Sequence, residues 1–314
     1  MRPLKIAVLA ARADGWHARD LRRAARRLDV ELSFPDFCGL SAAVAAVECE
    51  GRNPAGIRSG GVDLADFDAV LVRSIPAGTL EQVVFRMDAL HRLEASGVAL
   101  VNRPAAIECA IDKYLALARL AAAGIAVPAT RVTETADRAL SDFDALGGRT
   151  VVKPLFGSGG RGMFLVEDRE LAGRAFRALE RIGAVIYQQE FVPLPEGDLR
   201  VLVVAGEAVL AMRRTARARG EPASGGGPAE WRTNIARGGS ARPHVLTTDE
   251  AHLAVQAAAA IGGEVAGVDL LPADDGTLYV SEVNSAPGWK ALARSTGADV
   301  AALVLGHLRR RAGR

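Results

Sequence analysis

Short apolar runs alternate with longer amphipathic runs through the first hundred residues. The apolar runs have the length of buried strands and are Lys5–Ala10, Ala69–Val72 and Val98–Val101. Helical spacing of apolar positions marks Ala18–Leu28 and Leu80–Ser96 between them. Strands and helices that alternate in this way indicate an α/β layer around a parallel sheet.

The segment Gly51–Gly61 is rich in Gly, Pro and Asn, so it is predicted to be a loop. One long helix is then predicted from Ile107 to Ala123, with Gly124 at its C-terminus, where glycine is favoured. The pattern that follows predicts two strands around a glycine turn, then a helix capped by Asp168, then a strand. These elements are Thr150–Leu155, Met163–Glu167, Arg169–Arg181 and Val185–Val192.

The last third of the chain contains two predicted hairpins and one helix. The hairpin strands are Leu199–Ala205 with Ala208–Arg214, and Val265–Leu271 with Thr277–Val283. Thr247 and Glu250 form a capping box for a helix that ends near Ile261. The glycine-rich segment Arg217–Glu230 is interpreted as a mobile loop near the functional site, with a passive insertion as the alternative.

Composition narrows the class of protein. The chain has 314 residues, of which 49% are hydrophobic and 24% charged, with a net charge of +2, as expected of a globular protein with two or three domains. Its three cysteines form no CxxC pair, which argues against a disulfide framework or a zinc site. No apolar run reaches membrane-spanning length, and no basic cluster is interleaved with aromatic residues. We therefore expect a cytoplasmic protein without membrane or nucleic-acid partners.

A lysine-led glycine loop lies near the middle of the chain. Lys153 precedes the run Gly157-Ser158-Gly159-Gly160-Arg161-Gly162, which matches the dinucleotide pattern GxGxxG. A dinucleotide-binding loop must open a helix, whereas the residues after Gly162 predict a strand. The loop is therefore interpreted as a flap whose backbone amides approach phosphate oxygens, with Lys153 supplying a charge. An ordinary hairpin turn beside an exposed lysine is the alternative.

Three oxygen-bearing side chains follow about 120 residues later: Asp269, Glu282 and Asn284. If the second hairpin turns at residues 273–276, Asp269 lies opposite Val280, and alternation brings the three side chains to one face. Magnesium prefers carboxylate and amide oxygens together with phosphate and water. The set therefore predicts a magnesium site, against the alternative of solvent-facing acids on an edge hairpin.

Between these two features lies a cluster of residues suited to binding carboxylates or phosphates. It consists of Arg200, Arg213, Arg214, Arg232 and Asn234. Arg200 and Arg213 fall on predicted strands of the first hairpin, which favours their facing a ligand.

The ordered set of motifs resembles the ATP-grasp superfamily of carboxylate–amine ligases, and within it the RimK-type glutamate ligases. The matching strings are Asp112-Lys113, Val151-Val152-Lys153-Pro154 with the glycine loop, Gln188 to Val192, Asp198-Leu199-Arg200, Trp231 to Asn234, Gly267 to Leu270, and Glu282-Val283-Asn284. The resemblance spans roughly residues 70 to 305. It implies an ATP-grasp fold, α+β in its ATP-binding part, behind an N-terminal Rossmann-like pre-ATP-grasp domain. The expected domains are residues 1–104, 105–187 (the lid) and 188–314.

The resemblance also implies roles for individual residues. Lys113 and Lys153 would contact nucleotide phosphates, Glu190, Phe191 and Val192 would line the adenine hinge, and Asp198 would lie near the ribose. The full set of implied nucleotide-binding residues is Lys113, Lys153, Gly157, Ser158, Gly159, Gly160, Gly162, Gln189, Glu190, Phe191, Val192, Asp198 and Arg200. Asp269, Glu282 and Asn284 would hold two magnesium ions, with manganese as an alternative metal. Arg213, Arg232 and Asn234 would face the acyl phosphate and the substrate carboxylates.

The implied reaction is an ADP-forming amide synthesis. A carboxylate attacks the γ-phosphate of ATP, and an amine then displaces phosphate from the acyl phosphate. The strings Arg73 to Thr79 and Asn284 to Trp289 most resemble relatives that add L-glutamate to a pterin-linked acid in tetrahydromethanopterin-type cofactor biosynthesis. A ligase acting on a protein C-terminus or carrier protein, and an inactive nucleotide-binding protein, remain alternatives, and homo-oligomerisation stays open.

Overall fold

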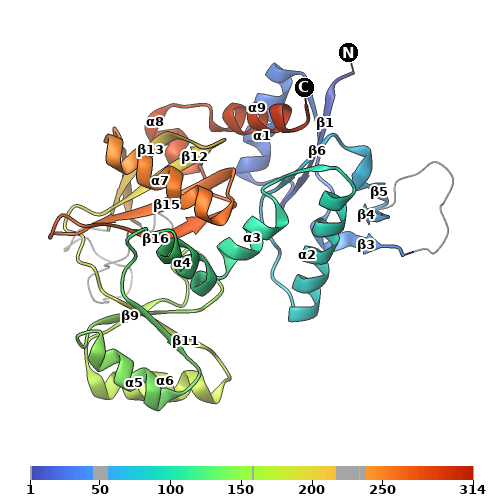
Figure 1. Cartoon of the computed structure of the whole chain (residues 1–314). Helices are drawn as coiled ribbons and strands as arrows, with labels where there is room; N and C mark the ends of the chain where they lie inside the picture. The colour runs from blue at the N-terminus through green and yellow to red at the C-terminus, as the bar shows by residue number, and fades with distance from the viewer. Residues whose placement is uncertain (1, 45–55, 158, 217–232, 234–237, 314) are drawn as a thin grey trace.

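The structure is a computed structural model that describes residues 2–44, 56–157, 159–216, 233 and 238–313 (Figure 1). Its described strands form four sheets. The predicted loop Arg217–Glu230, together with Ser158, Arg232 and Asn234, lies outside these residues. Among the described helices, none combines the length and apolar character needed to cross a membrane.

The N-terminal sheet is parallel, as predicted, with the order β2-β1-β6-β7. Its strands are β1 (Leu4–Leu9), β2 (Val30–Ser33), β6 (Ala69–Val72) and β7 (Ala99–Val101). Helices α1 (Trp16–Leu28) and α2 (Leu80–Ala95) connect them. Both predicted helices and all three predicted strands are therefore confirmed, with small shifts at their ends.

A small antiparallel sheet corrects the prediction of a loop over Gly51–Gly61. Within that range, β4 (Ile57–Ser59) pairs with β3 (Leu40–Ala42) and β5 (Val62–Asp63). The side chains of Ile57 and Leu64 are fully buried, so apolar anchoring overrides the loop-forming composition. Two 3-10 turns, Phe37–Gly39 and Leu64–Asp66, flank this sheet.

The predicted single helix Ile107 to Ala123 is two helices, α3 (Pro104–Ile111) and α4 (Lys113–Ala122). The break is at Asp112, which takes the extended conformation with φ −91° and ψ 104°. Its carboxylate accepts hydrogen bonds from the amides of Tyr114 (2.9 Å) and Leu115 (3.0 Å), so it caps α4. The continuous apolar stripe concealed this break.

The lid is a four-stranded antiparallel sheet of order β10-β9-β11-β8. Its strands are β8 (Thr130–Thr133), β9 (Thr150–Lys153), β10 (Phe164–Val166) and β11 (Ile186–Glu190). Helices α5 (Ala136–Ala145) and α6 (Arg169–Arg181) cover one face around Phe143 and Phe176 (Figure 1). A strand follows Gly162, as predicted, and the predicted boundary after residue 187 falls inside β11.

The C-terminal sheet is antiparallel with the order β14-β13-β12-β15-β16. Its strands are β12 (Asp198–Val204), β13 (Glu207–Thr215), β14 (Ser240–Pro243), β15 (Val265–Pro272) and β16 (Leu278–Asn284). Helix α7 (Thr248–Ile261) starts at the predicted capping box of Thr247 and Glu250 and packs on one face. Helices α8 (Lys290–Thr296) and α9 (Val300–Arg311) follow the sheet.

The register of the second hairpin differs from the prediction. Asp269 pairs with Glu282, not with Val280, because a β-bulge lies between Asp269 and Leu270. Asn284, two residues after Glu282, pairs with Gly267, two residues before Asp269. Side chains of one strand alternate between faces, so Asp269, Glu282 and Asn284 still share one face of the sheet.

One hydrophobic core joins the two ends of the chain. It packs β1 and β6 with α1, α9 and one face of β12 and β15, and includes Leu202, Val265 and Trp289. The fully engaged amide of Asn102, at the end of β7, adds a polar link to this contact. It accepts from the amides of Glu264 (2.7 Å) and Val265 (2.8 Å) and donates to the carbonyl oxygens of Val265 and Ser285. The carboxyl end of β16 is thereby fixed to the N-terminal domain.

Candidate active site

A cavity of about 280 Å³ lies between the lid sheet and the C-terminal sheet. Its walls contain residues from both of the sequence features that predict a nucleotide site. The lining residues are Lys113, Val151, Lys153, Gly160, Met163, Gln189, Glu190, Phe191, Val192, Leu194, Asp198, Arg214, Ala216, Thr233, Asp269, Leu271, Ser281 and Glu282. Residues separated by more than 120 positions thus meet in one pocket.

Two lysines face this pocket from different elements. Lys153 is the last residue of β9, and its Nζ donates to Oε1 of Gln189 at 2.6 Å. Removal from water lowers the pKa of Lys153 to about 8, although the negative charge of Glu282 acts in the opposite direction. Burial likewise lowers the pKa of Lys113, again opposed by Glu282. Both ammonium groups therefore lie in the field of one carboxylate.

The glycine loop is tied to the start of α4. Nζ of Lys113 donates to the carbonyl oxygen of Gly157 at 2.7 Å. Gly159, Gly160 and Gly162 have φ of 68°, 68° and 72°, a region that other residues rarely adopt. A Cβ at Gly162 would also lie 2.9 Å from Cγ of Pro154. The loop geometry therefore requires glycine, and Gly160 reaches the pocket wall.

On the opposite wall, Asp269 is buried between two arginines. Arg200 forms a bidentate ion pair with Asp269, and Nη2 of Arg214 lies 3.1 Å from its Oδ2. Although burial alone raises the pKa of Asp269, the two guanidinium groups hold it below its ordinary value. Asp269 is therefore ionised at neutral pH.

The set around Asp269 fits a hard cation. The side-chain Nδ2 of Asn284 is buried without a hydrogen-bond partner, and the oxygen and nitrogen of an amide are interchangeable by rotation. After this rotation, the unsatisfied atom would be the amide oxygen, on the same face of the sheet as the carboxylates of Glu282 and Asp269. Within the described part of the chain, no three His, Cys, Asp or Glu side chains form a metal-holding group. The remaining ligands of a magnesium ion would then be phosphate oxygens and water.

Close approach explains a glycine beside this set. A Cβ on Gly267 would lie 2.8 Å from Cβ of Pro287 and 3.1 Å from Nη1 of Arg200. Gly267 therefore lets the arginine cross over β15 to reach Asp269.

Arg214, rather than Arg213, points to the pocket. Its guanidinium donates to both oxygens of Asp198, at 2.7 and 2.6 Å, and Asp198 also accepts from Oγ1 of Thr233 at 2.7 Å. Arg213 pairs with Leu199 on the other face of the hairpin, and among the described residues its ion-pair partner is Glu196 at 3.6 Å. The structure therefore does not bring Arg213 together with the predicted metal set.

The connection between lid and C-terminal sheet forms a third wall. The backbone amide of Glu190 donates to the carbonyl oxygen of Ala129. The carboxylate of Glu190 in turn accepts a hydrogen bond from the backbone amide of Ala129 at 2.8 Å. The guanidinium of Arg149 stacks 4.0 Å above the ring of Phe191. These contacts fix the backbone of residues 190–192 at the pocket edge.

Most of the sequence-predicted residues meet in this pocket, but not all of them. Those on its wall are Lys113, Lys153, Gly160, Gln189, Glu190, Phe191, Val192, Asp198, Asp269 and Glu282. Gly157, Gly159, Gly162, Arg200 and Asn284 lie beside it or support it. Arg214 and Thr233 also line this pocket, although neither is among the residues to which the resemblance assigns a role. Arg213 and Arg214 lie on opposite faces of β13, and the packing of the sheet against the lid brings the face of Arg214 to the pocket.

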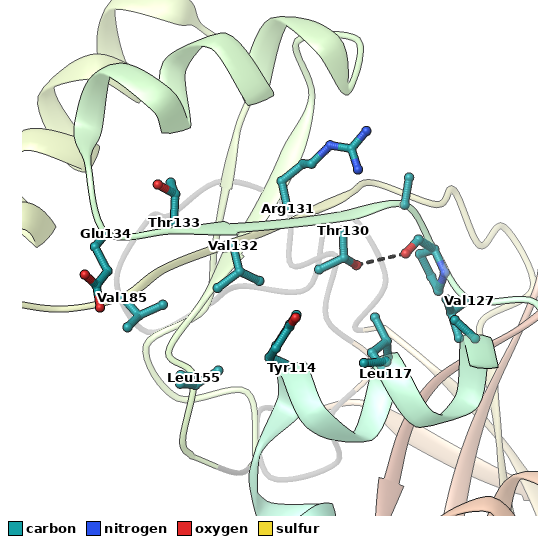
Figure 2. A pocket seen from close by; sticks show the side chains of 14 residues that line it. Tyr114, Leu117, Val127, Thr130, Arg131, Val132, Thr133, Glu134, Leu155 and Val185 are labelled. Carbon is teal, nitrogen blue, oxygen red and sulfur yellow. Dashed lines mark hydrogen bonds between the residues drawn. The ribbon is translucent and has the colours of Figure 1, made fainter. Parts of the chain in front are cut away.

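A second cavity of about 580 Å³ lies between α4 and β8 (Figure 2). Tyr114 and Leu117 of α4 face Thr130 and Val132 of β8 across it. Its lining is mostly apolar and includes neither the lysine pair nor the carboxylates of the first cavity. Volume alone therefore does not identify the reactive pocket.

Two family models match the chain. One describes the RimK pre-ATP-grasp domain and matches residues 4–107, and the other describes the RimK-like ATP-grasp domain and matches residues 110–308. A tetrahydromethanopterin:alpha-L-glutamate ligase of Methanosarcina acetivorans is 32% identical, over 97% of this chain and 98% of that protein. A ribosomal protein bS6--L-glutamate ligase of Salmonella paratyphi B is 33% identical, over 98% and 97%.

Solved structures share the fold. The ATP-grasp ligase PsnB in complex with a minimal precursor superimposes with a TM-score of 0.75 at 19% identity, over 99% of this chain and all of that chain. The D-cycloserine synthetase DcsG gives 0.71 at 21% identity, over 98% and 99%. Together with the two family models, which cover most of the sequence, these matches show that the chain belongs to the RimK-like ATP-grasp family and is an ATP-grasp ligase.

Proposed function

We propose that this ligase adds L-glutamate to a carboxylated acceptor with consumption of ATP, and that the acceptor is tetrahydromethanopterin or a closely related pterin. The pocket that sets Lys113 and Lys153 opposite Asp269 and Glu282 is the observation that carries the ATP chemistry. The names of the similar proteins support glutamate, and the relative from Methanosarcina acetivorans supports the pterin.

The chemistry of the pocket suits an acyl-phosphate route. Lys113 and Lys153 neutralise nucleotide phosphates, and the backbone of residues 190–192 binds the base. The acceptor carboxylate attacks the γ-phosphate and releases ADP, and the amine of glutamate then displaces phosphate to form the amide. Such a reaction requires positioning and charge neutralisation rather than a protein nucleophile.

The metal would be held by Asp269, Glu282 and Asn284. Magnesium bound there would supply positive charge to the transferring phosphoryl group. We propose two ions, with manganese able to replace magnesium, and Arg200 and Arg214 keeping Asp269 ionised before the metal enters. Arg214 is proposed to serve the phosphoryl side of the pocket, while the roles predicted for Arg213, Arg232 and Asn234 remain predictions.

A protein acceptor is the second candidate, because the ribosomal protein bS6--L-glutamate ligases are as similar in sequence as the pterin ligase. Incubation with ATP, magnesium and L-glutamate, with either tetrahydromethanopterin or protein bS6, separates the two. ADP release with a glutamyl mass increment on the pterin is the expected result. A glutamyl increment on bS6 alone would show that the acceptor is a protein and not a pterin. Absence of both ADP release and a mass increment with either acceptor would contradict the proposed function. The Glu282→Ala variant should lose turnover while keeping its melting temperature.

A further inference from the structure

Arg73 lies where the N-terminal sheet changes its direction of winding. It directly follows β6, which pairs with β1, and β1 pairs on its other side with β2. The chain therefore continues from β1 to a strand on one side of it, β2, and from β6 to a strand on the opposite side, β7. In open α/β sheets, ligands bind outside the carboxyl ends of strands at such a switch point.

Backbone contacts keep the two strand ends together beyond the sheet. The amide of Arg73 donates to the carbonyl oxygen of Leu9 at 2.8 Å, and the amide of Ala11 donates to Oγ of Ser74 at 2.8 Å. These hydrogen bonds therefore fix the backbone of Arg73 at the carboxyl edge of the sheet.

The guanidinium of Arg73 lacks a described counter-ion. It lies 4.1 Å above the ring of Trp289, and its Nη2 donates to the carbonyl oxygen of Pro287 at 2.9 Å. Its Nε is buried without a hydrogen-bond partner, and no carboxylate of the described residues acts on its charge. Burial lowers the pKa of Arg73 to about 10, which still leaves it charged at neutral pH. Arg73 is only half-buried, so a ligand can reach the guanidinium. A cation partly withdrawn from water without an acid costs free energy that an anionic ligand would return.

The ring of Trp289 forms a platform under Arg73, and burial and hydrogen bonds hold this residue in place. Trp289 is 1% exposed, its Nε1 donates to Asp20 at 2.9 Å, and its amide donates to Nε2 of His17 at 3.1 Å. Burial and the nearby charge of Arg73 lower the pKa of His17 to about 4, so that nitrogen remains an acceptor at neutral pH. A platform this rigid pre-organises the guanidinium for a planar bidentate partner.

The chain also sets the distance to the reactive pocket. Only two residues, Ser285 and Ala286, separate Asn284, on the predicted metal face, from Pro287, the acceptor of the Arg73 hydrogen bond. The three steps from the Cα of Asn284 to that of Pro287 span at most about 11 Å when fully extended. A small dicarboxylate could therefore place one carboxylate at Arg73 and its other end near the metal face.

We propose that Arg73, stacked on Trp289, binds a carboxylate of one of the two substrates at the carboxyl edge of β1 and β6. This rests on the proposed function, because the carboxylate belongs either to L-glutamate or to the pterin acceptor. Arg73 is here a substrate-binding residue supplied by the N-terminal domain, across the interface from the nucleotide pocket.

Trp289 is a built-in reporter for this subsite. The chain has three tryptophans, so Trp16→Phe and Trp231→Phe leave Trp289 as the only one. Glutarate, L-glutamate and tetrahydromethanopterin are titrated separately into this variant in the presence of magnesium and a non-hydrolysable ATP analogue. A saturable change in Trp289 fluorescence with at least one of them is expected. The responding compound identifies which substrate supplies the carboxylate.

Three further variants make the test specific. In the same reporter, Arg73→Met should weaken the binding about 10- to 100-fold, as expected for loss of charge-assisted hydrogen bonds. Arg73→Lys, which keeps the charge and guards against misfolding, should weaken it about 10-fold because lysine cannot bind bidentately. Arg22→Met is the matched control, since Arg22 also stacks on an aromatic ring, 4.0 Å above Phe34, but beyond the end of β2 rather than β6, and should leave the affinity unchanged.

Absence of a saturable change with all three compounds, or equal affinity in Arg73→Met and the parent, would overturn the proposal. Failure of the proposed function has a different signature. In that case glutarate would still change Trp289 fluorescence in an Arg73-dependent way, while ADP release and glutamyl transfer would be missing for both acceptors.

Discussion

At the scale of single residues, the ammonium of Lys153 titrates in an accessible range. Its pKa of about 8 in the free protein lies below the ordinary value of 10.5, because burial disfavours the charged form. Nucleotide phosphates favour that form, so binding should take up a proton above pH 8. The affinity for a non-hydrolysable ATP analogue should therefore fall as pH rises through 8, by up to about tenfold per unit. Calorimetry in buffers of different ionisation enthalpy measures both effects.

The Lys153→Arg variant is the control for this pH dependence. Arginine stays protonated throughout the range, so proton uptake and the decline in affinity should both disappear. If the variant shows the same dependence as the parent chain, another group causes it. Lys113, whose pKa is also lowered by burial, would then be the next residue to replace.

Neighbouring arginines on β13 should differ sharply in their effect on stability. Arg214 is 7% exposed and pairs with the buried Asp198 and Asp269. Arg214→Met leaves Asp198 without a described cationic partner, while Asp269 keeps only its ion pair with Arg200. The free energy of unfolding should fall by about 3–5 kcal/mol. Among the described residues, the ion pair that Arg213→Met removes is a 3.6 Å contact to the 74% exposed side chain of Glu196, and its loss should cost less than about 1 kcal/mol. Urea denaturation of both variants measures the difference, and equal losses would contradict the assignment of faces.

At the scale of elements, the break between α3 and α4 sets the position of Lys113. Asp112 caps α4, and the first residue of that helix then reaches Gly157 in the glycine loop. Asp112→Ala should lower the free energy of unfolding by about 1 kcal/mol and weaken binding of the ATP analogue. Asp112→Asn, an equally good cap, should preserve both. Wild-type nucleotide affinity in Asp112→Ala would show that the cap does not position Lys113.

Local sequence signals predicted some elements well and could not predict others. The capping box of Thr247 and Glu250 is a short-range signal, and α7 begins there. By contrast, the bulge at Asp269 depends on how two strands pair, and no residue in either strand encodes it by itself. The same limit applies to the prediction that Arg213, and not Arg214, faces the ligand. Alternation fixes which residues share a face, whereas tertiary packing decides which face meets the ligand.

At the scale of the whole molecule, the cores are unequal. The core that contains Trp289 ties the N-terminal sheet to the C-terminal sheet and to α9. The lid has its own small core of eight buried residues around Phe143 and Phe176, separate from the others. Its link to the body includes the contact of Lys113 with Gly157 and the hydrogen bond from the amide of Val280 to Ala126, 2.9 Å. Opening of the lid as a unit therefore breaks far fewer buried contacts than opening of the central sheet.

Native-state hydrogen exchange should reveal this difference. Amides of β9, β11, α5 and α6 should exchange together, with a lower opening free energy than those of β12 and β15. Magnesium and the ATP analogue should slow exchange in the lid, because the ligand bridges Lys153 and Gly160 on one wall to Asp269 and Glu282 on the other. Amides of β1 serve as the internal reference, since that strand lies outside the pocket. Equal protection of lid and central sheet in the free protein, or no slowing on nucleotide binding, would show that the lid does not open separately and that the nucleotide does not join the two walls.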